Sequence, residues 1–467
     1  MLSDTISESD IDKTVDKLMS QEIKDSIQTI NYQLNTLYTS SGQSPFVTIW
    51  MYVNENPEYE SETALLIEEM LKQRIAGMLS PSGKRINPTF PKLIYCLSEK
   101  NITKDTPYFY LTKLAAECTS KRMVPDYISE KVMKRLKDGD VFPSMGCRSF
   151  LTPYIDPETG KHKHYGRLNL GVISLNIPYL ALESKTQEEF FVKLEKYARI
   201  ICDEQLRIAE TISDSPSKRS PIMWNYGAIS RLPEDAKIGE LLKKNKGYAT
   251  ISLGYCGIAE AVYRFGIEYV SDEGHEMGKK ILETLNRVTN EYKEKTPYDF
   301  GVYGTPSESL TTKFAAVLKR FKKIPGVNDK TYITNSYHVP VTKEINCFDK
   351  LKFESGLQEL STGGAISYVE MPDINKNPEA AYDVMKFIYD NIMYAEINTT
   401  SCDVCYNCGY EGEITLHDDY TTECPNCGCT DTSKMYVCRR MCGYLGNIVS
   451  GTTKGRFDDI HDRVKHA

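Results

Sequence analysis

Apolar residues recur every three or four positions along several long stretches of the chain, with charged residues between them. This spacing gathers the apolar side chains on one face of a helix, so it predicts amphipathic helices that pack on a core. The predicted helices are Ile11–Leu37, Glu62–Leu79, Glu188–Ser213 and Gly274–Lys295.

Short apolar runs lie between these helices and predict buried strands. They are Pro91–Leu97, Gly166–Asn176, Tyr248–Leu253, Tyr298–Tyr303 and Ala365–Met371. Alternation of strands and helices predicts an α/β architecture, with a barrel as the favoured arrangement. The chain becomes rich in Cys and Gly after about residue 398. We therefore predict a large α/β domain over residues 1–397, followed by two small parts, 398–432 and 433–467.

Composition narrows the class of protein. The 467 residues are 40% hydrophobic and 26% charged, with a net charge of −7, as in ordinary soluble proteins. An acidic chain has no basic field to attract nucleic acid. No apolar run has the length of a membrane span, and the polar N-terminus is unlike a secretory signal. Fourteen cysteines in such a chain indicate reduced thiols and a cytoplasmic location.

The C-terminal part holds two Cys-x-x-Cys pairs, Cys405 with Cys408 and Cys424 with Cys427. Each pair offers two sulfurs to one ion, and the fifteen residues between the pairs are typical of a four-thiolate zinc ribbon. We predict a structural zinc site, with disulfide or redox use as the alternative.

Two nearby cysteines, Cys402 and Cys429, break the paired spacing and are not expected to be ligands. The segment between the pairs is acidic, with Glu411, Glu413 and Asp418. A zinc ribbon that binds nucleic acid is therefore the weaker interpretation, because phosphates would be repelled.

A glycine follows the zinc motif in the string Arg440-Met441-Cys442-Gly443-Tyr444-Leu445. Glycine has no side chain on its α-carbon, so a radical formed there can flatten and delocalise into both flanking peptide groups. We predict a backbone radical at Gly443, held in place by the neighbouring zinc site. The alternative is an ordinary turn that needs a positive φ.

Far upstream, Cys147 follows Met145 and Gly146, and a strand-like run after it contains Asn169 as a polar residue. A lone cysteine is often an inert core residue. A buried amide needs hydrogen-bond partners, which either the core or a substrate hydroxyl supplies. Both interpretations remain open from the residues alone.

The string Tyr303-Gly304-Thr305-Pro306-Ser307-Glu308-Ser309-Leu310 follows a predicted strand and opens a predicted helix. Proline in a first helical turn, hydroxyl side chains and free backbone N–H groups are typical of an anion site. The alternative is a capped helix, with Thr305 or Ser307 as the N-cap residue.

Several strings occurring in order resemble the catalytic subunit of the anaerobic (class III) ribonucleoside-triphosphate reductases, which are glycyl-radical enzymes. Because the strings run over essentially the whole chain, the resemblance is more specific than any one motif. They are Gly42–Phe46, Met145–Ser149, Thr305–Leu310, Asn335–His338 and Gly455–Ile460.

The resemblance implies a role for each candidate residue. Gly443 is implied to store the radical, Cys147 to become the transient thiyl radical, Asn169 to be the active-site amide, and Met145 to lie near the reductant. Substrate phosphates are implied to bind Thr305, Pro306, Ser307, Glu308 and Ser309. Cys405, Cys408, Cys424 and Cys427 are implied to bind structural zinc.

The implied reaction is the anaerobic reduction of ribonucleoside triphosphates to 2′-deoxyribonucleoside triphosphates. The implied partners are a radical-SAM [4Fe–4S] activating protein and a second copy of the catalytic unit. Formate is the implied reductant, with a thiol protein as the alternative. The implied fold is a ten-stranded α/β barrel, here residues 1–397, with the zinc ribbon and the glycyl-radical loop following it.

Members of this family are longer at the N-terminus, where they carry a regulatory nucleotide-binding cone and the first barrel strands. The resemblance therefore implies a barrel that lacks its N-terminal part, and a separate chain that completes it. Two alternatives remain: another glycyl-radical enzyme of the acyl-lyase type, and an inactive fragment that only binds nucleotides.

Overall fold

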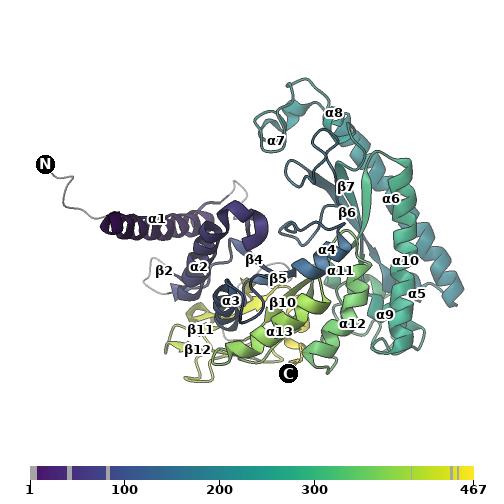
Figure 1. The fold of residues 1–467 in the computed structure, drawn as a ribbon. Coiled ribbons are helices and arrows are strands. Elements are labelled where there is room, and N and C mark those ends of the chain that lie inside the picture. Colours follow the sequence, from purple (N-terminus) through teal and green to yellow (C-terminus); the bar gives the residue numbers. More distant parts are fainter. Residues whose placement is uncertain are drawn as a thin grey trace.

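The computed structural model describes residues 8–38, 45–79, 85–400, 402–441, 445–449 and 452–466 (Figure 1). Strands β11 (Val404–Cys405) and β12 (Tyr410–Glu411) lie at the lower left of the view, and helix α1 (Glu8–Thr36) projects to the left above them (Figure 1). Among the described helices, none is long and apolar enough to cross a membrane.

One sheet has three parallel strands in the order β6 (Leu168–Asn176), β7 (Ala249–Cys256) and β8 (Asp299–Gly304). Strand β7 is buried along its whole length, as expected for a central parallel strand. The long helices α6 (Gln187–Ser213) and α10 (Asp272–Lys295) pack on this sheet and on each other.

A second sheet has five strands in the order β1-β4-β5-β10-β9, and only the β5–β10 pair is antiparallel. The strands are β1 (Thr48–Met51), β4 (Lys92–Leu97), β5 (Asp126–Ser129), β10 (Tyr394–Asn398) and β9 (Ser367–Glu370).

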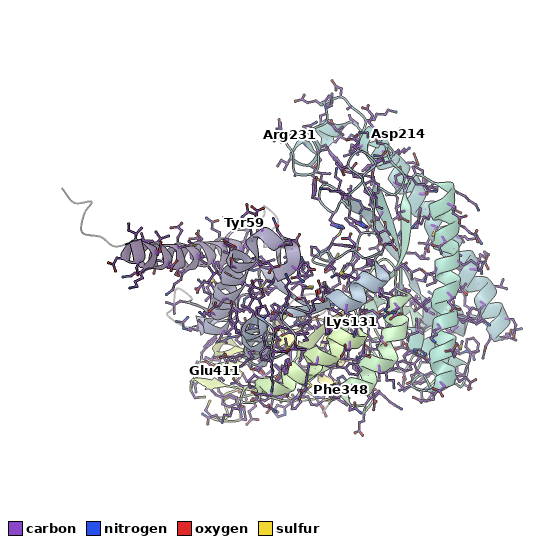
Figure 2. The ribbon with its side chains drawn as sticks, in the orientation of Figure 1. Tyr59, Lys131, Asp214, Arg231, Phe348 and Glu411 are labelled. Carbon is purple, nitrogen blue, oxygen red and sulfur yellow. The ribbon has the colours of Figure 1, made fainter. Side chains whose placement is uncertain are left out.

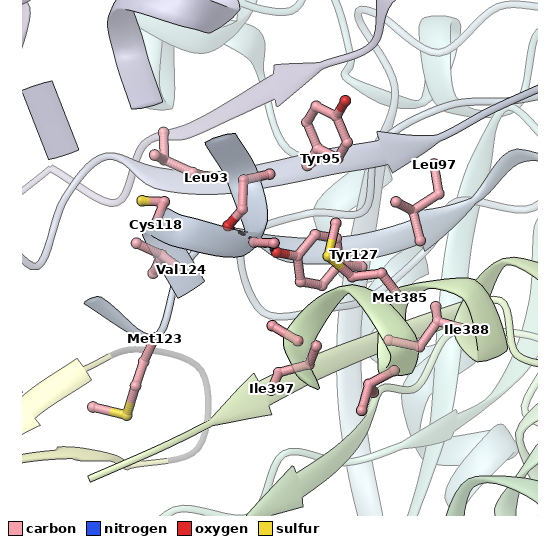
Figure 3. Packing of buried hydrophobic residues seen from close by; sticks show 14 of the residues in the cluster. Leu93, Tyr95, Leu97, Cys118, Met123, Val124, Tyr127, Met385, Ile388 and Ile397 are labelled. Atoms are coloured by element: carbon pink, nitrogen blue, oxygen red, sulfur yellow. Dashed lines mark hydrogen bonds between the residues drawn. The ribbon is translucent and has the colours of Figure 1, made fainter. Parts of the chain in front are cut away.

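Helices α2 (Glu60–Ala76), α3 (Phe109–Arg122) and α13 (Pro378–Asn391) contribute to the core on one face of this second sheet. Figure 3 shows Tyr95 and Tyr127 from the strands beside Met385 and Ile388 from α13. The buried hydroxyl of Tyr127 lies 2.5 Å from the Thr119 hydroxyl, so a large aromatic ring is accommodated without an unsatisfied polar atom.

A parallel bridge between Tyr303 and Gly364 links β8 to the segment that enters β9. Eight strands of the described residues therefore follow one another from β6 at one end to β1 at the other. The predicted ten-stranded barrel is not formed by these residues, because β1 pairs only with β4 and β6 only with β7.

Figure 2 shows the same arrangement with side chains, with Tyr59 near α2 on one side and Arg231 near α7 on the other. The remaining helices of five or more residues are α4 (Glu130–Leu136), α5 (Ile177–Leu182), α9 (Ile258–Arg264), α11 (Leu310–Leu318), α12 (Cys347–Glu359) and α14 (Lys454–His461). The short ones are α7 (Pro221–Trp224) and α8 (Gly239–Leu242).

The C-terminal residues form small antiparallel sheets over their own core, which includes Ile414, Val437 and Phe457. Their strands are β11 (Val404–Cys405), β12 (Tyr410–Glu411), β13 (Thr415–Leu416), β14 (Thr422–Glu423), β15 (Met435–Tyr436), β16 (Cys438–Arg440) and β17 (Leu445–Asn447). A further hairpin joins β2 (Met78–Leu79) to β3 (Arg85–Ile86).

Candidate active site

Cys147 lies on a tight loop that precedes the three-stranded sheet. The Met145 N–H donates to the Ser149 carbonyl at 2.8 Å, and the Arg148 N–H donates to the Met145 carbonyl at 2.8 Å. Arg148 has a φ of +70°, a conformation that is uncommon outside glycine. The loop leaves Cys147 exposed and Met145 half-buried, so the thiol is accessible.

The Cys147 loop packs against the glycine pair Gly363-Gly364, which precedes β9. A Cβ atom on Gly364 would lie 2.5 Å from the Arg148 carbonyl oxygen and 2.7 Å from the Phe150 nitrogen. Gly364 also has a φ of +114°, so only glycine fits. Its neighbour Gly363 accepts a hydrogen bond from the Phe150 N–H at 3.0 Å, which fixes the loop on the sheet.

Side chains from three strands converge on the loop. The Tyr303 hydroxyl at the end of β8 donates to the Cys147 carbonyl. The Asn169 amide on β6 donates to the Ser149 hydroxyl at 3.2 Å and to the Ser252 hydroxyl at 2.5 Å. Asn169 therefore lies beside the Cys147 loop, and protein groups bind its amide nitrogen.

The glycine loop is described only at its two ends. Strands β16 and β17 form an antiparallel hairpin in which Arg440 pairs with Leu445. Gly443 falls between these two residues in sequence and lies outside the described residues.

One buried carboxylate connects the hairpin to the Cys147 loop. The Glu396 carboxylate on β10 accepts from Arg148 Nη2 at 2.6 Å, and Arg440 Nε lies 3.4 Å from the same oxygen. Arg148 follows Cys147 directly, and Arg440 precedes Gly443 by three residues. Cys147 and Gly443 are nearly 300 positions apart in the sequence, yet an arginine close to each of them contacts the same Glu396 side chain.

Asp126 on β5 extends this contact into a cluster. Its carboxylate lies 2.9 Å from Lys92 Nζ and 3.3 Å from Arg440 Nη2, and it accepts from the Tyr394 hydroxyl at 2.9 Å. We call Lys92, Asp126, Arg148, Glu396 and Arg440 the charge cluster; each is at most 5% exposed.

The charge cluster also determines the protonation state of Asp126. Burial raises the pKa of Asp126, but Lys92, Arg440 and Arg148 outweigh burial and lower the pKa to about 2. Asp126 is therefore ionised at neutral pH, as a cluster with three cations requires.

Successive arginines of β16 anchor the hairpin on two sides, since side chains alternate along a strand. Arg440 enters the charge cluster, whereas Arg439 Nη1 binds Asp403 at 2.5 Å. Asp403 also accepts from the backbone N–H groups of Cys438 at 2.8 Å and Ile414 at 2.9 Å. The hairpin is thus fixed to both the sheet and the zinc-motif module.

The Thr305–Ser309 string does not form the start of the helix as predicted. Helix α11 begins at Leu310, and the residue before it, Ser309, makes no side-chain capping bond. The Ser307 hydroxyl instead donates to the Thr305 carbonyl at 3.0 Å. The interpretation of Thr305 or Ser307 as the N-cap is therefore wrong, because Pro306 lies four residues before the helix.

Other groups hold this string as a separate loop. The Ser307 N–H donates to the Asn335 side chain at 3.0 Å, and the Thr305 and Ser174 hydroxyls lie 2.7 Å apart. Glu308 and Ser309 are exposed. The Asn335–His338 string thus supports the loop.

A small cavity of about 20 Å³ joins these parts. Its walls come from the Cys147 loop, the Thr305 loop, the β16 strand and helix α14. The residues that matter here are Arg148, Thr305, Pro306, Asn335, Arg440 and Arg456.

The four predicted zinc ligands meet in space. The sulfurs of Cys405, Cys408, Cys424 and Cys427 all lie within 4.8 Å of one another, with separations of 3.8 Å (Cys405–Cys427) and 3.7 Å (Cys408–Cys424). A tetrahedral zinc ion with Zn–S bonds of about 2.3 Å requires S–S separations of about 3.8 Å. A disulfide needs about 2.05 Å, so the geometry fits zinc.

Neighbouring groups support the thiolates. The Asn426 amide donates to Cys408 Sγ at 3.4 Å. This bond, with smaller contributions from the Tyr410 backbone and the neighbouring Cys427 and Cys424, lowers the pKa of Cys408 to about 6. Cys402 lies elsewhere, with its thiol 3.2 Å from the Lys121 carbonyl, and is not in the four-sulfur group.

The sequence patterns did not single out Glu396, Asp126 or Lys92. Glu396 lies within strand β10, and Lys92 and Asp126 are the first residues of strands β4 and β5. A polar residue in a buried strand is also the signal that singled out Asn169. What the sequence could not provide was their partners, which lie up to about 300 positions away.

The fold resembles that of solved anaerobic ribonucleotide reductases. A solved structure named anaerobic ribonucleotide reductase superposes with a TM-score of 0.67 at 16% identity, over 98% of this chain and 70% of that one. The Thermotoga maritima anaerobic ribonucleotide reductase with glycerol in the active site gives a TM-score of 0.62 over 97% and 69%. At these identities the likeness defines the class of fold: that of the anaerobic ribonucleotide reductases.

Sequence comparison defines the family. A family model described as anaerobic ribonucleoside-triphosphate reductase matches residues 6–466. Proteins of that name are 38% identical in Haemophilus influenzae, over 98% of this chain, and 36% identical in Enterobacteria phage T4, over 96%. The chain belongs to the anaerobic ribonucleoside-triphosphate reductase family. It spans 64% of the Haemophilus relative and 72% of the phage relative.

Proposed function

We propose that this chain carries the radical and substrate sites of an enzyme that reduces ribonucleoside triphosphates to 2′-deoxyribonucleoside triphosphates. The observation that supports it most directly is the shared carboxylate of Glu396, which binds the neighbour of Cys147 and the root of the Gly443 hairpin. Family membership removes the support for an acyl lyase and for a zinc ribbon that binds nucleic acid.

Gly443 stores the radical in this proposal. It takes the hydrogen atom of the Cys147 S–H bond, and the resulting thiyl radical takes the 3′-hydrogen of the ribose. The 2′-hydroxyl then leaves as water. Formate is oxidised to carbon dioxide and supplies two electrons and one proton; solvent supplies the second proton. Cys147 finally returns the hydrogen atom to C3′, and the radical returns to Gly443.

The other residues bind and orient. Asn169 lies beside the Cys147 loop and offers its amide oxygen, which also accepts from the Gly171 N–H, to a ribose hydroxyl. Met145 borders the space for formate, and the Thr305–Ser309 loop binds phosphates. The reaction needs a closed, water-poor site, because stray donors quench radicals. The buried walls of the cavity fit that need.

The proposed cofactors and location follow from the same site. Zinc bound by the four cysteines holds the root of the hairpin and takes no part in the chemistry. A radical-SAM [4Fe–4S] activating protein removes the α-hydrogen of Gly443. Because oxygen would cleave the backbone at the radical, the enzyme works anaerobically, in the cytoplasm.

A completing chain is the second part of the proposal. Strands β1 and β6 each have one neighbour among the described strands. The apolar side chain of Val172 on β6 is exposed (46%). Unpaired strand edges and exposed apolar surface favour association. We therefore propose that further strands, on a separate polypeptide, complete a ten-stranded barrel, and that the complete unit forms a homodimer.

Electron paramagnetic resonance tests the radical assignments. After anaerobic incubation with the activating protein and S-adenosylmethionine, the chain should give a glycyl doublet that disappears in Gly443→Ala. In Cys147→Ser the doublet should remain while deoxynucleotide formation stops. Turnover by Cys147→Ser would contradict the thiyl assignment, and nucleotide binding without any radical would support the inactive-fragment alternative.

A further inference from the structure

The Thr305–Ser309 loop lacks a positive charge, although it is the proposed phosphate site. Its only charged residue is Glu308. A triphosphate carries several negative charges, and proteins ordinarily bind phosphates with arginine, lysine or a metal ion. A cationic side chain from elsewhere in the fold that reaches the loop would supply the missing positive charge.

Arg456 is a cation that lines the same cavity as Thr305 and Pro306. It lies on helix α14, which follows the β16–β17 hairpin in the chain. Its side chain is nearly fully buried, with the residue 3% exposed.

The guanidinium of Arg456 is only partly satisfied. Nη1 donates to the Asp459 carboxylate at 2.5 Å, whereas Nε and Nη2 are buried and have no hydrogen-bond partner among the described residues. Nε and Nη2 form one edge of the planar guanidinium, the edge that binds two oxygens of one oxyanion side by side. Leaving such donors unpaired is costly, so the arrangement indicates a missing ligand.

The carboxylates near Arg456 are paired with other cations, so they do not repel an anionic ligand. Asp459 is shared, since Arg463 Nη2 also lies 3.4 Å from it. The next carboxylate on the cavity wall, Glu396, is bound by Arg148 and Arg440.

Close packing fixes the position of Arg456. A Cβ on the preceding residue, Gly455, would lie 2.5 Å from the Thr312 hydroxyl on α11 and 2.6 Å from the Thr331 carbonyl. Only glycine permits α14 to approach α11 this closely. Arg456 is therefore a rigidly placed donor, unlike an arginine on a surface loop.

We propose that Arg456 binds a phosphate group of the ribonucleotide substrate through Nε and Nη2, beside the Thr305 loop. This inference rests on the proposed function and names a residue for its substrate site. Because Arg456 and the Gly443 hairpin belong to one C-terminal segment, the phosphate helps to hold that segment in place. By reciprocity, a docked hairpin strengthens phosphate binding.

Equilibrium binding to the full chain, with the completing polypeptide added where turnover needs it, tests the inference without requiring the radical. The probes are ATP, GTP, CTP and UTP, inorganic tripolyphosphate, and the four unphosphorylated nucleosides. Arg456→Gln should weaken triphosphate and tripolyphosphate binding by about 10-fold to 100-fold, as expected for the loss of charged hydrogen bonds. Nucleoside binding should stay unchanged, and Arg456→Lys should weaken the phosphate ligands less.

Lys454→Gln is the matched control, because it removes the same charge from the same helix at an exposed position against Tyr420. It should bind all probes like the parent chain. Equal triphosphate affinity in parent and Arg456→Gln would overturn the inference, as would a raised KM for formate with substrate binding intact. Failure of the radical assay, with phosphate binding still dependent on Arg456, would count against the proposed function alone.

Discussion

At the scale of single residues, Glu396 is the side chain on which the proposed radical route depends. Replacing the buried Glu396 carboxylate by an amide leaves the three buried cations of the charge cluster with one anion, Asp126. We expect Glu396→Gln to retain a glycyl doublet but to lower turnover by about 100-fold, since a misplacement of about 1 Å near a reacting group has effects of this size.

The matched control for Glu396→Gln is Glu359→Gln. Glu359 pairs with Arg135 at the surface, where an ion pair contributes little. It should leave turnover unchanged. Normal turnover in Glu396→Gln would show that the shared carboxylate does not position the two loops.

The protonation of Asp126 gives a prediction about pH. Its pKa is lowered in the folded protein to about 2, below the value of about 3.9 in an unfolded chain. The stabilisation is therefore complete above about pH 4 and is lost as the pH falls toward 2. Urea unfolding between pH 6 and pH 2.5 should show a steeper acid loss of stability in the parent chain than in Asp126→Asn.

Asp126→Asn itself should lower the free energy of unfolding by about 3–5 kcal/mol at neutral pH. The three buried cations Lys92, Arg148 and Arg440 then share one anion, Glu396. An acid profile in Asp126→Asn that parallels the parent would show that Asp126 is not ionised in the folded state.

At the scale of elements, β16 links the zinc-motif module to the sheet through its alternating arginines. Removing zinc should therefore release the hairpin and abolish radical formation, while the two main sheets stay folded. Circular dichroism should show an almost unchanged main thermal transition, and electron paramagnetic resonance should show no doublet.

Two cysteine variants sharpen the zinc test. Cys405→Ser should lose the metal, whereas Cys402→Ser should keep it, because the Cys402 thiol faces the Lys121 carbonyl and not the four-sulfur group. Collapse of the whole fold on zinc removal would mean that the module is part of the main core.

The elements themselves were largely predictable. The four periodic stretches and five apolar runs correspond to helices α1, α2, α6 and α10 and strands β4, β6, β7, β8 and β9, with ends shifted by a few residues. Local spacing determines such elements. The helix after the Thr305 loop was placed too early, because Pro306 and the hydroxyl residues resemble a first helical turn, whereas Asn335, far along the chain, holds them in a loop.

The candidate site was predictable in its parts and not in its assembly. Cysteine spacing predicted the four sulfurs that the structure brings together. The order of motifs singled out Cys147 and the Thr305 loop, whose roles stay predictions. The charge cluster brings Lys92, Asp126, Arg148, Glu396 and Arg440 from five separate segments, so no window of sequence contains it. Arg456 was within a recognised string, yet only its unpaired edge in the cavity gives it a proposed role.

At the scale of the whole molecule, the open ends at β1 and β6 lead to a prediction about assembly. Val172→Lys places a charge on the β6 edge, where it should oppose strand addition. The variant should fold normally but bind the completing chain more weakly, as measured by co-purification or analytical ultracentrifugation.

Ile222→Lys on α7 is the control for Val172→Lys, because Ile222 is also an exposed apolar residue (72%) but lies on a helix and not on a strand. It should respond to the completing chain like the parent. Full turnover by the 467-residue chain alone would contradict the need for any such chain.

The most direct test of the account is the separation between the Gly443 α-carbon and the Cys147 sulfur in a crystal structure of the enzyme with a ribonucleoside triphosphate bound. With Arg148 and Arg440 both on Glu396, we predict van der Waals contact, at about 3.5–4 Å. Other side chains standing between the two atoms in that closed, substrate-bound state would contradict the account.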